Sequence, residues 1–366
     1  MCVCGRCSPA NHVGIIPIPP GSKRQLRFKI SDNVHEYNCV RNAFLRAGFK
    51  RTNGSGWNAL WAKHLTEEQF LRMTPYQKAN HFPGTWGIGR KDRLARNLSR
   101  MKRDFGKKYH FSVRTFYLPN ERMKLQMEMD ADPKVRLQCT AIAWLACWWC
   151  RHSGCAQAIW ILKPAASSCG RGIKLVSGQA NSKLPKKRKL LAQHYIRNPL
   201  LINGHKWDLR MYVARGGMLV RLHTARLTSW LWLWVVRRYV LVTSFDPLRV
   251  YLFDNGLTRF CTEKYTVNHK TLKNRFAHLT NYSVNKHSDK FLKNEDPDND
   301  MYGSKWSFKA LMRYFKQNDM PGDTIRDSIK DVVIKTLLSI ESDVGSLSNR
   351  YFPNRYAVMW YRCVQL

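Results

Sequence analysis

The chain has 366 residues, of which 62 are lysine or arginine and 25 are aspartate or glutamate, so its formal net charge at pH 7 is +37. Such a charge favours a polyanionic partner, namely nucleic acid, an anionic membrane or a strongly acidic protein, and a basic chain without one particular partner fits the composition as well. The length is sufficient for a sizeable core and for roughly two or three domains.

Cysteine usage and the apolar runs indicate the compartment. Eleven cysteines are an odd number, and charge and proline interrupt the first 24 residues, so we expect a reduced protein without a secretory leader. Cys4, Cys7, Cys147 and Cys150 could form a zinc site only by meeting across about 140 residues, and unpaired thiols explain them more simply. The apolar runs 141–150 and 230–236 are shorter than the roughly 20 residues of a membrane helix.

The first regular element is expected near Leu26, after an irregular lead-in over residues 1–24. Four apolar residues at steps of four, three and four predict a helix in residues 91–106: Leu94, Leu98, Met101 and Phe105. The opposite face of this helix is basic and carries Arg93, Arg96, Arg100 and Arg103.

Residues 160–256 are rich in strand signals. The predicted strands are Trp160–Lys163, Ile173–Val176, Leu190–Ile196, Lys206–Val213 and the two runs that flank Phe245–Leu248. Phe245–Leu248 and Asp254–Gly256 carry turn signals, so this part is predicted to be mostly antiparallel sheet.

Helical spacing returns late in the chain. Trp306–Phe315 and Ile325–Ile340 are predicted helices, with Asp323 or Thr324 as the N-cap of the second. One side of the second helix is expected to carry Ile325, Ile329, Val332, Val333, Thr336 and Ile340.

The stretch WILKPAASSCGRGIKLV (160–176) places a lysine where a strand ends and a loop of small residues begins. Pro164 holds Lys163 at the strand end because it fixes its own φ and restricts the residue before it. The small loop residues allow backbone N–H groups to approach phosphate oxygens: Ser167, Ser168, Gly170 and Gly172. Arg171 adds a cation, although an ordinary turn would also explain the loop, which matches neither GxxxxGK[ST] nor GxGxxG.

Two later segments add polar groups. In residues 205–211 the strand alternation places Lys206, Asp208 and Arg210 on one face, opposite Trp207, Leu209 and Met211, which fits a sheet that covers a ligand; a solvated charged face is the alternative. Residues 278–286 (HLTNYSVNK) concentrate hydroxyl and amide groups suited to a phosphate or an amino acid, or to a turn-rich loop. Neither a local serine–histidine pair nor HExxH is present, so hydrolysis is not predicted.

These segments, in this order, resemble the tubulin tyrosine ligase-like family, and within it the polyglutamylases. The resemblance rests on WILKP…SSCGRGI, LLAQHYIRNPLLINGHKWDLRMYV, VTSFDPLRVYLFDNGLTRF and HLTNYSVNK, together with HFPGTWGIGRKDRLARNLSRMKRDFGKK upstream, and runs from His81 to about Phe352. It implies an α/β (α+β) ATP-grasp fold with antiparallel sheets flanked by helices. It also implies a ligase that uses ATP and Mg²⁺ to join free glutamate to glutamate side chains in acidic tubulin tails.

The resemblance also implies roles for single residues. The implied ATP-binding residues are Lys163, Gly170, Arg171, Gly172, Gln193, His194, Tyr195, Ile196, Lys206, Asp208, Thr280 and Asn281. Lys206 would reach the phosphates and Asp208 the ribose. The implied glutamate-binding residues are Arg259, Tyr282, Ser283 and Lys305. The implied catalytic residues are Lys206, Arg210 and Arg259. The basic helix, taken as Arg90–Lys108, would attract the acidic tail of tubulin or microtubules.

The resemblance, together with the composition, sets the expected organisation. The expected parts are a lead-in (1–24), a small N-terminal domain (25–78), a central ATP-grasp domain (79–190) with an insertion at 138–158, a C-terminal ATP-grasp domain (191–355) with an insertion at 214–240, and a divergent tail (356–366). We expect a cytoplasmic monomer on the cytoskeleton, with the cilium or basal body as a candidate location, that binds neither a membrane nor a specific nucleic acid.

Two departures from the family pattern affect the expected chemistry. Cys169 stands where the family's loop has an arginine, with Arg171 at the variable position beside it. The family's magnesium-binding Asp, Glu and Asn are not found after Phe352, so the metal ligands are expected to be absent and the activity impaired.

Two alternatives to the ligase remain at this stage. The first is a non-catalytic, basic microtubule-binding protein. The second is a nucleic-acid binder, based on the charge and on Lys183–Lys189 (KLPKKRK), a run that is also compatible with a nuclear localisation patch or a solvated loop. No RNP, zinc-finger or KH pattern supports the second alternative.

Overall fold

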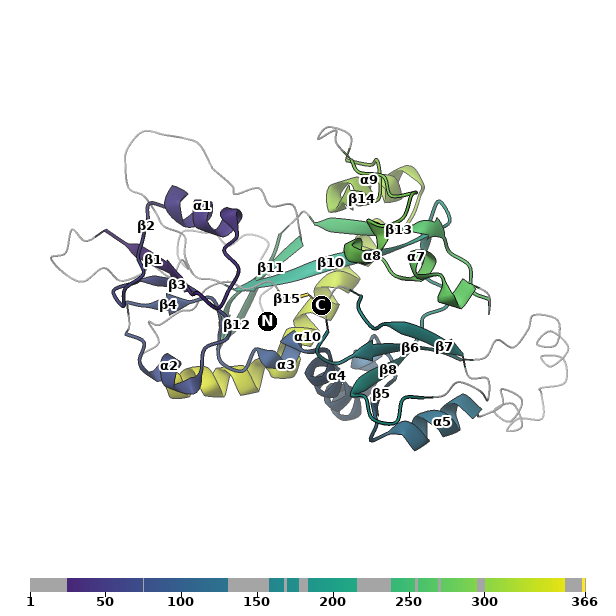
Figure 1. The fold of residues 1–366 in the computed structure, drawn as a ribbon, viewed down its shortest axis with the longest axis horizontal. Coiled ribbons are helices and arrows are strands. Elements are labelled where there is room, and N and C mark those ends of the chain that lie inside the picture. Colours follow the sequence, from purple (N-terminus) through teal and green to yellow (C-terminus); the bar gives the residue numbers. More distant parts are fainter. Residues whose placement is uncertain are drawn as a thin grey trace, which may run out of the picture. The chain divides into compact units, whose positions relative to one another are not determined.

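The computed structural model describes residues 25–74, 76–130, 158–167, 170–177, 184–215, 238–253, 256–268, 271–294, 300–352 and 364–365 (Figure 1). The chain divides into two compact units. The first comprises Met1–Gly89, Arg210–Leu257 and Met312–Leu366, and the second comprises Arg90–Leu209 and Thr258–Leu311. The predicted domain boundaries at 78/79 and 190/191 stay predictions, and the four cysteines considered for zinc lie outside the described residues.

A small parallel sheet begins the first unit. Its strands are β1 (Arg27–Ile30), β2 (Lys50–Arg51), β3 (Ala59–Trp61) and β4 (Lys78–Ala79), in the order β2-β1-β3-β4. The same unit contains the helices α1 (Asn38–Arg46), α2 (Glu67–Leu71) and α3 (Trp86–Gly89). Phe28 and Phe49 are buried in its core, and the Phe44 ring of α1 stacks on Phe28 with centroids 4.7 Å apart. Apolar burial of this kind is what holds a short sheet of this size together.

The first unit is completed by β11 (Arg238–Phe245), β12 (Leu248–Leu252), β15 (Val364–Gln365) and the long helix α10 (Gly322–Tyr351). β11 and β12 form an antiparallel hairpin, and β11 runs parallel to the end of β10 (His205–Arg215), with Val213 opposite Val240. The buried side of α10 has apolar residues at helical spacing, Val333, Leu337, Ile340 and Val344, together with the buried Thr336, Ser339 and Gly345.

A four-stranded antiparallel sheet forms the core of the second unit. Its strands are β5 (Thr115–Leu118), β6 (Ile159–Pro164), β7 (Lys174–Ser177) and β8 (Leu190–His194), in the order β5-β8-β6-β7. Helix α5 (Arg122–Asp130) packs against β5 (Figure 1). The Trp160 and Phe116 rings meet edge to face, with Leu125 in the same cluster. The unit also contains α4 (Lys91–Phe105) and the 3-10 helix η2 (Gly106–Tyr109).

The remaining elements of the second unit surround the start of β10. They are β9 (Leu201–Ile202), β13 (Leu257–Lys264), β14 (Lys305–Ser307), the 3-10 helix η4 (Thr271–Lys273) and the short helices α7 (Arg275–His278) and α8 (Tyr282–Asn285), with α9 (Phe308–Gln317) starting here and ending in the first unit. β13 lies between β10 and β14. Asn285 ties α8 to β13, since its carboxamide oxygen accepts hydrogen bonds from the Thr262 backbone N–H and hydroxyl, both at 3.0 Å.

The predicted class, a mixed α/β fold with antiparallel sheets flanked by helices, is confirmed. The helix at 91–106 is observed as α4, the strands around 160–163 and 173–176 as β6 and β7, and the Phe245–Leu248 turn as the link of the β11–β12 hairpin. The four arginines of α4 are all exposed, as the spacing predicts.

Four details of the prediction are wrong. Phe105 is 53% exposed because α4 ends there, and Ala95 is buried instead. Trp306 lies in β14, two residues before α9 begins. The strand predicted to reach Ile196 ends at His194. Helix α10 begins after Pro321 without a side-chain cap, so neither Asp323 nor Thr324 is its N-cap; Asp323 lies in the first turn, where its charge suits the helix N-terminus.

Candidate functional site

Three lysines of the second unit come together. Lys163 is near the end of β6, Lys206 near the start of β10, and Lys91 is the first residue of α4. Burial, together with the smaller effects of the positive charges of Lys91 and Lys206, lowers the pKa of Lys163 to about 8. In the described part of the chain none of the three forms an ion pair, so no salt bridge compensates their charge. Asp92 and Asp208, which are paired with arginines, act on Lys91 and Lys206 without an ion-pair contact, and the cluster remains positive. Such a cluster favours a bound anion.

Lys206 is held by aromatic and carbonyl groups. Its Nζ donates to the Tyr195 hydroxyl (3.0 Å) and to the His278 carbonyl oxygen (3.2 Å), and it lies 4.5 Å from the centroid of the Tyr195 ring. Burial lowers the pKa of Lys206, against the opposing effect of Asp208. The Tyr195 hydroxyl also meets His278 Nδ1 at 2.9 Å, so these three residues form one network.

Lys163 and Lys91 are held by uncharged oxygens. The Gln193 carboxamide oxygen accepts from Lys163 Nζ at 2.7 Å, and the Gln193 amide donates to the Thr115 hydroxyl at 3.2 Å. The Ser167 carbonyl oxygen accepts from Lys91 Nζ. Since neutral oxygens do not cancel the charges, both ammonium groups are positioned and remain available to an anion.

The implied ATP-binding residues 193–196 begin on β8 and continue past its end. Gln193 faces the lysine cluster, and Tyr195 is buried. His194 is exposed, with its ring edge against Trp160, and Ile196 is 59% exposed. The backbone N–H of Tyr195 donates to the Ile159 carbonyl, so the segment still adjoins β6.

Asp208 and Arg259 form a bidentate ion pair between β10 and β13. The distances are 3.0 Å from Arg259 Nε to Asp208 Oδ1 and 2.7 Å from the guanidinium to Oδ2. Burial raises the pKa of Asp208, while Arg259, a hydrogen bond from Thr280 and the charge of Lys206 act in the opposite direction. The pair therefore fixes a planar guanidinium beside the lysine cluster.

The loop between β6 and β7 bends at two glycines. Gly170 and Gly172 both have φ of +72°, a conformation that side chains disfavour. Gly170 is packed so closely on α8 that an added Cβ would lie 3.1 Å from Val284 Cγ2 and 3.3 Å from Asn281 Cγ. Arg275 supports the loop by donating to the Gly170 carbonyl at 3.0 Å. The predicted ATP-binding residues Gly170 and Asn281 are thus neighbours.

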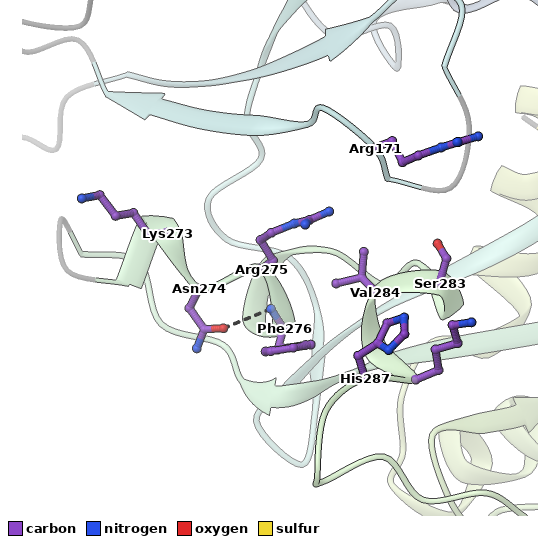
Figure 2. A pocket seen from close by; sticks show the side chains of 9 residues that line it. Arg171, Lys273, Asn274, Arg275, Phe276, Ser283, Val284 and His287 are labelled. Carbon is purple, nitrogen blue, oxygen red and sulfur yellow. Dashed lines mark hydrogen bonds between the residues drawn. The ribbon is translucent and has the colours of Figure 1, made fainter.

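Among the predicted glutamate-binding residues, Lys305 and Tyr282 are in contact, since Lys305 Nζ lies 3.8 Å from the centre of the Tyr282 ring. Phe291 packs edge to face on the same ring. Ser283 follows on α8, but it lines a different feature, the pocket of Figure 2. Arg259 is engaged with Asp208, so the four residues do not converge on one contact.

The remaining predicted residues are placed as follows. Thr280 is buried beside Asp208, Arg171 is exposed and lines the pocket of Figure 2, and Arg210 follows Asp208 on β10 but is assigned to the first unit. Cys169 lies outside the described residues.

Sequence reasoning missed several members of this site. The sequence assigns Lys91 only to the basic helix. Its position immediately before the apolar spacing of α4 is the signal that it lies at the N-terminal end of that helix. Cys261, on β13 between the lysine cluster and the ion pair, has its pKa raised to about 12 by burial and is therefore a neutral thiol. Thr115, Tyr265 and His278 complete the surroundings of Gln193 and Tyr195. His278 begins the polar segment 278–286 that the sequence marks. No sequence signal links Thr115 or Tyr265 to the site, because side-chain contacts between distant segments bring them there.

Metal ligands are a separate question. The described residues contain no group of three or more His, Cys, Asp or Glu side chains arranged to hold a metal ion, and Asp208 is occupied by Arg259. The predicted loss of magnesium carboxylates concerns the residues that follow Phe352, of which 353–363 lie outside the described part. It stays a prediction.

Among the helices in the described part of the chain, none has the length and apolar character needed to cross a bilayer.

Comparison with known protein families matches residues 69–218 and 236–359 to the tubulin-tyrosine ligase family. The match omits residues 219–235, which fall within the predicted insertion at 214–240 and outside the described residues. The predicted insertion at 138–158 is likewise outside them, apart from Ala158. The resemblance seen in the sequence is thus confirmed, whereas both insertions stay predictions.

Three curated relatives illustrate the similarity. The tubulin monoglutamylase TTLL4 of Mus musculus is 37% identical over 342 residues, which are 93% of this chain and 24% of that protein. The tubulin polyglutamylases TTLL5 and TTLL7 of Mus musculus are each 32% identical; each alignment covers 92% of this chain, and 21% and 33% of the respective relatives. The chain therefore spans about a quarter of the length of the curated relatives it matches.

Among solved structures, the C-terminal domain of K. lactis Pby1, described as an ATP-grasp enzyme that interacts with the decapping enzyme Dcp2, is 16% identical to this chain. It aligns with a TM-score of 0.44 over 86% of this chain and 75% of that one.

Proposed function

Because the chain belongs to the tubulin-tyrosine ligase family, we propose that it is an ATP-dependent ligase that joins glutamate to glutamate side chains of tubulin tails. The relatives are named for adding one glutamate or several, and the proposal covers glutamate ligation of either kind. The chain corresponds to about a quarter of those proteins, so the activity is proposed here for the segment that the family match covers.

The observation that carries the proposal is the positive cluster of Lys91, Lys163 and Lys206. Like charges brought together in a poorly solvated site destabilise the fold unless a counter-charge is bound. The depressed pKa of Lys163 is the signature of this repulsion and burial. A triphosphate supplies the missing negative charge, and the glycine loop beside the cluster supplies backbone N–H groups.

The chain's residues would divide the work of binding ATP. Lys163, Lys206 and Lys91 would neutralise the phosphates, and Gln193, which orients Lys163, would keep that ammonium group directed at them. Tyr195 and the residues of β8 next to it would line the rest of the nucleotide site. When bound, ATP would supply the phosphoryl group that turns the acceptor carboxylate into an acylphosphate, leaving ADP; the glutamate amine would then attack the acyl carbon, forming the amide and releasing inorganic phosphate.

The incoming glutamate would be recognised by cations. Arg259 is held rigidly by Asp208, so its guanidinium offers a preorganised partner for a carboxylate. Lys305, stacked on Tyr282, is a second cation for the same ligand. Arg210 and Ser283 are proposed to assist from the neighbouring strand and helix. The described residues contain no group of three or more His, Cys, Asp or Glu side chains that could hold a metal ion, and no part of this assignment depends on a metal.

The acceptor is proposed to be attracted by charge. The exposed arginines of α4 and the net charge of +37 would draw an acidic tubulin tail towards the site. Association with microtubules would place the protein on the cytoskeleton, and the cilium or basal body is the finer location that we propose. We further propose a monomer that needs neither a membrane nor a specific nucleic acid.

The test is incubation of the purified chain with ATP, Mg²⁺, labelled glutamate and microtubules. Incorporation of label into tubulin is expected, at a reduced level if the predicted loss of the magnesium carboxylates holds. Lys206→Met should abolish it, whereas Lys124→Met, which changes an exposed lysine on α5, should not. Salt-sensitive pelleting with microtubules but without label would contradict the ligase and favour the non-catalytic binding protein.

A further inference from the structure

A second basic feature of the same unit is not explained by nucleotide or glutamate binding. A pocket of about 630 Å³ opens between the glycine loop, η4, α7 and α8 (Figure 2). Of the residues predicted from the sequence, Arg171 and Ser283 line it. Most of its wall consists of residues to which neither the sequence nor the comparisons assign a role.

The wall is basic on several sides. Its basic residues are Arg171, Lys273, Arg275, Lys286 and His287, which come from the loop, from η4 and α7, and from the end of α8 (Figure 2). All five residues are exposed, and no Asp or Glu is among the described residues that line the pocket. In the described part of the chain the four lysine and arginine residues among them form no ion pair. The charges are therefore available to a ligand and are spread over its whole perimeter.

The floor of the pocket is apolar. Phe276 and Val284 line it between the cations, and Figure 2 shows the two side chains beside Arg275 and His287. A ligand suited to this wall carries several separated negative charges on short apolar stems. Glutamate side chains have this character, because their methylene groups can contact the floor while each carboxylate reaches a cation.

The exposure of the cations also separates two classes of anionic ligand. A nucleotide base needs an enclosed apolar slot, whereas here all five basic residues lie at the surface, where an extended chain can pass across them. Surface cations contribute little singly, but a polyanion that meets several at once gains from each of them. The geometry thus favours a peptide over a nucleotide.

We propose that this pocket binds an acidic peptide segment through its side-chain carboxylates. That this peptide is the acceptor of the ligation rests on the proposed function; the binding itself does not. Arg275 lines the pocket and donates to the Gly170 carbonyl, so a bound peptide lies next to the loop that borders the proposed phosphate site.

The test measures peptide binding without any catalysis. Fluorescence anisotropy of a labelled hexaglutamate peptide, without ATP, is compared for the wild type and for the Lys273→Glu/Lys286→Glu double variant. We expect at least about tenfold weaker binding in the double variant, because two attractions become repulsions. Lys273→Arg/Lys286→Arg should retain the wild-type affinity. Lys124→Glu, the same charge change outside the pocket, should also leave the affinity close to the wild-type value.

Two results would overturn the pocket assignment. One is equal peptide affinity in the wild type and the double variant, with both folded by circular dichroism. The other is a double variant that loses affinity for a fluorescent ATP analogue and keeps it for the peptide, which would make the pocket a nucleotide site.

The outcomes also separate this proposal from the ligase. If the wild-type protein ligates glutamate to tubulin but the peptide binds the double variant as tightly as the wild type, the ligase stands and the pocket fails. If peptide binding follows the pocket charges but no ligation occurs, the pocket stands and the ligase fails.

Discussion

Arg259 holds Asp208 by two hydrogen bonds, of 3.0 and 2.7 Å, across 51 residues of sequence. Family resemblance assigns Asp208 to the nucleotide and Arg259 to glutamate, but the structure joins the two side chains. A ligand that binds one of them must therefore act on the other. We expect nucleotide and glutamate binding to be coupled through this pair.

The first prediction concerns the strength of the pair. Asp208→Asn and Arg259→Gln should each lower the free energy of unfolding by about 2 kcal/mol, less than for a fully buried pair because Asp208 is partly exposed. The double variant should lose less than the sum, since it leaves neither charge unpaired. Urea unfolding of the wild type, the two single variants and the double variant measures the coupling energy between the two side chains. Additive losses would show that the contact contributes nothing to stability.

The second prediction is that ATP affinity falls as pH rises through about 8. The pKa of Lys163 is lowered to about 8, so in the free protein this ammonium is charged below that pH and neutral above it. Because phosphate binding requires the charged form, affinity should decrease by at most about tenfold per pH unit for this one proton. Calorimetric titration with ATP between about pH 6.5 and 9.5 measures the slope.

A charge-preserving variant is the control for that slope. Lys163→Arg keeps its charge throughout this range, so its affinity should change less with pH than that of the wild type. Any remaining slope reports the other titrating groups, including Lys206 and Lys91, whose pKa values burial also lowers. Identical pH profiles for the two proteins would contradict a role of Lys163 in binding the phosphates.

The third prediction concerns Lys78 of β4, which is 1% exposed and whose Nζ has no hydrogen-bond partner in the described part of the chain. Burial lowers its pKa to about 8 from the ordinary 10.5. The folded state therefore holds this proton less tightly than the unfolded state, so its destabilising effect is full below about pH 8 and disappears as pH rises towards 10.5.

Replacing Lys78 by methionine should accordingly stabilise the protein by about 1–3 kcal/mol at pH 7, since the side chain keeps its length and loses its charge. The gain should shrink between about pH 8 and 10. Thermal melting at several pH values measures it. An unchanged or lower melting temperature at pH 7 would mean that the ammonium has a partner that stabilises it.

Local features were predictable from the sequence where one segment decides its own structure. The spacing of Leu94, Leu98 and Met101 is sufficient for α4, and the strand–turn–strand pattern around Asp246 is sufficient for a hairpin. Trp306 was assigned to a helix because its spacing continues that of α9, whereas pairing with β13 keeps it extended. Tertiary pairing overrode the local pattern there.

The site itself was predictable only in part. Lys163 and Lys206 were identified from motifs, but their shared neighbour Lys91 and the network of Tyr195 with His278 depend on elements 72 or more residues apart in sequence. The Asp208–Arg259 pair likewise follows from the adjacency of β10 and β13. A single sequence contains the residue types for these contacts, whereas the pairing of distant strands determines which of them meet.

The last prediction tests the glycine loop. Gly172 has φ of +72°, and an added Cβ would lie 2.9 Å from Pro164 Cγ, so Gly172→Ala meets both backbone strain and a clash with a rigid ring. We expect ATP affinity to fall about tenfold or more, because the loop must move away from the end of β6, where Lys163 lies. Gly56→Ala is the matched control, since nothing lies within 4 Å of its added Cβ and its φ is not positive. Calorimetric titration of both variants distinguishes the loop from a general effect of glycine replacement. If Gly172→Ala binds ATP as tightly as Gly56→Ala, the conformation of this loop does not contribute to holding the phosphates.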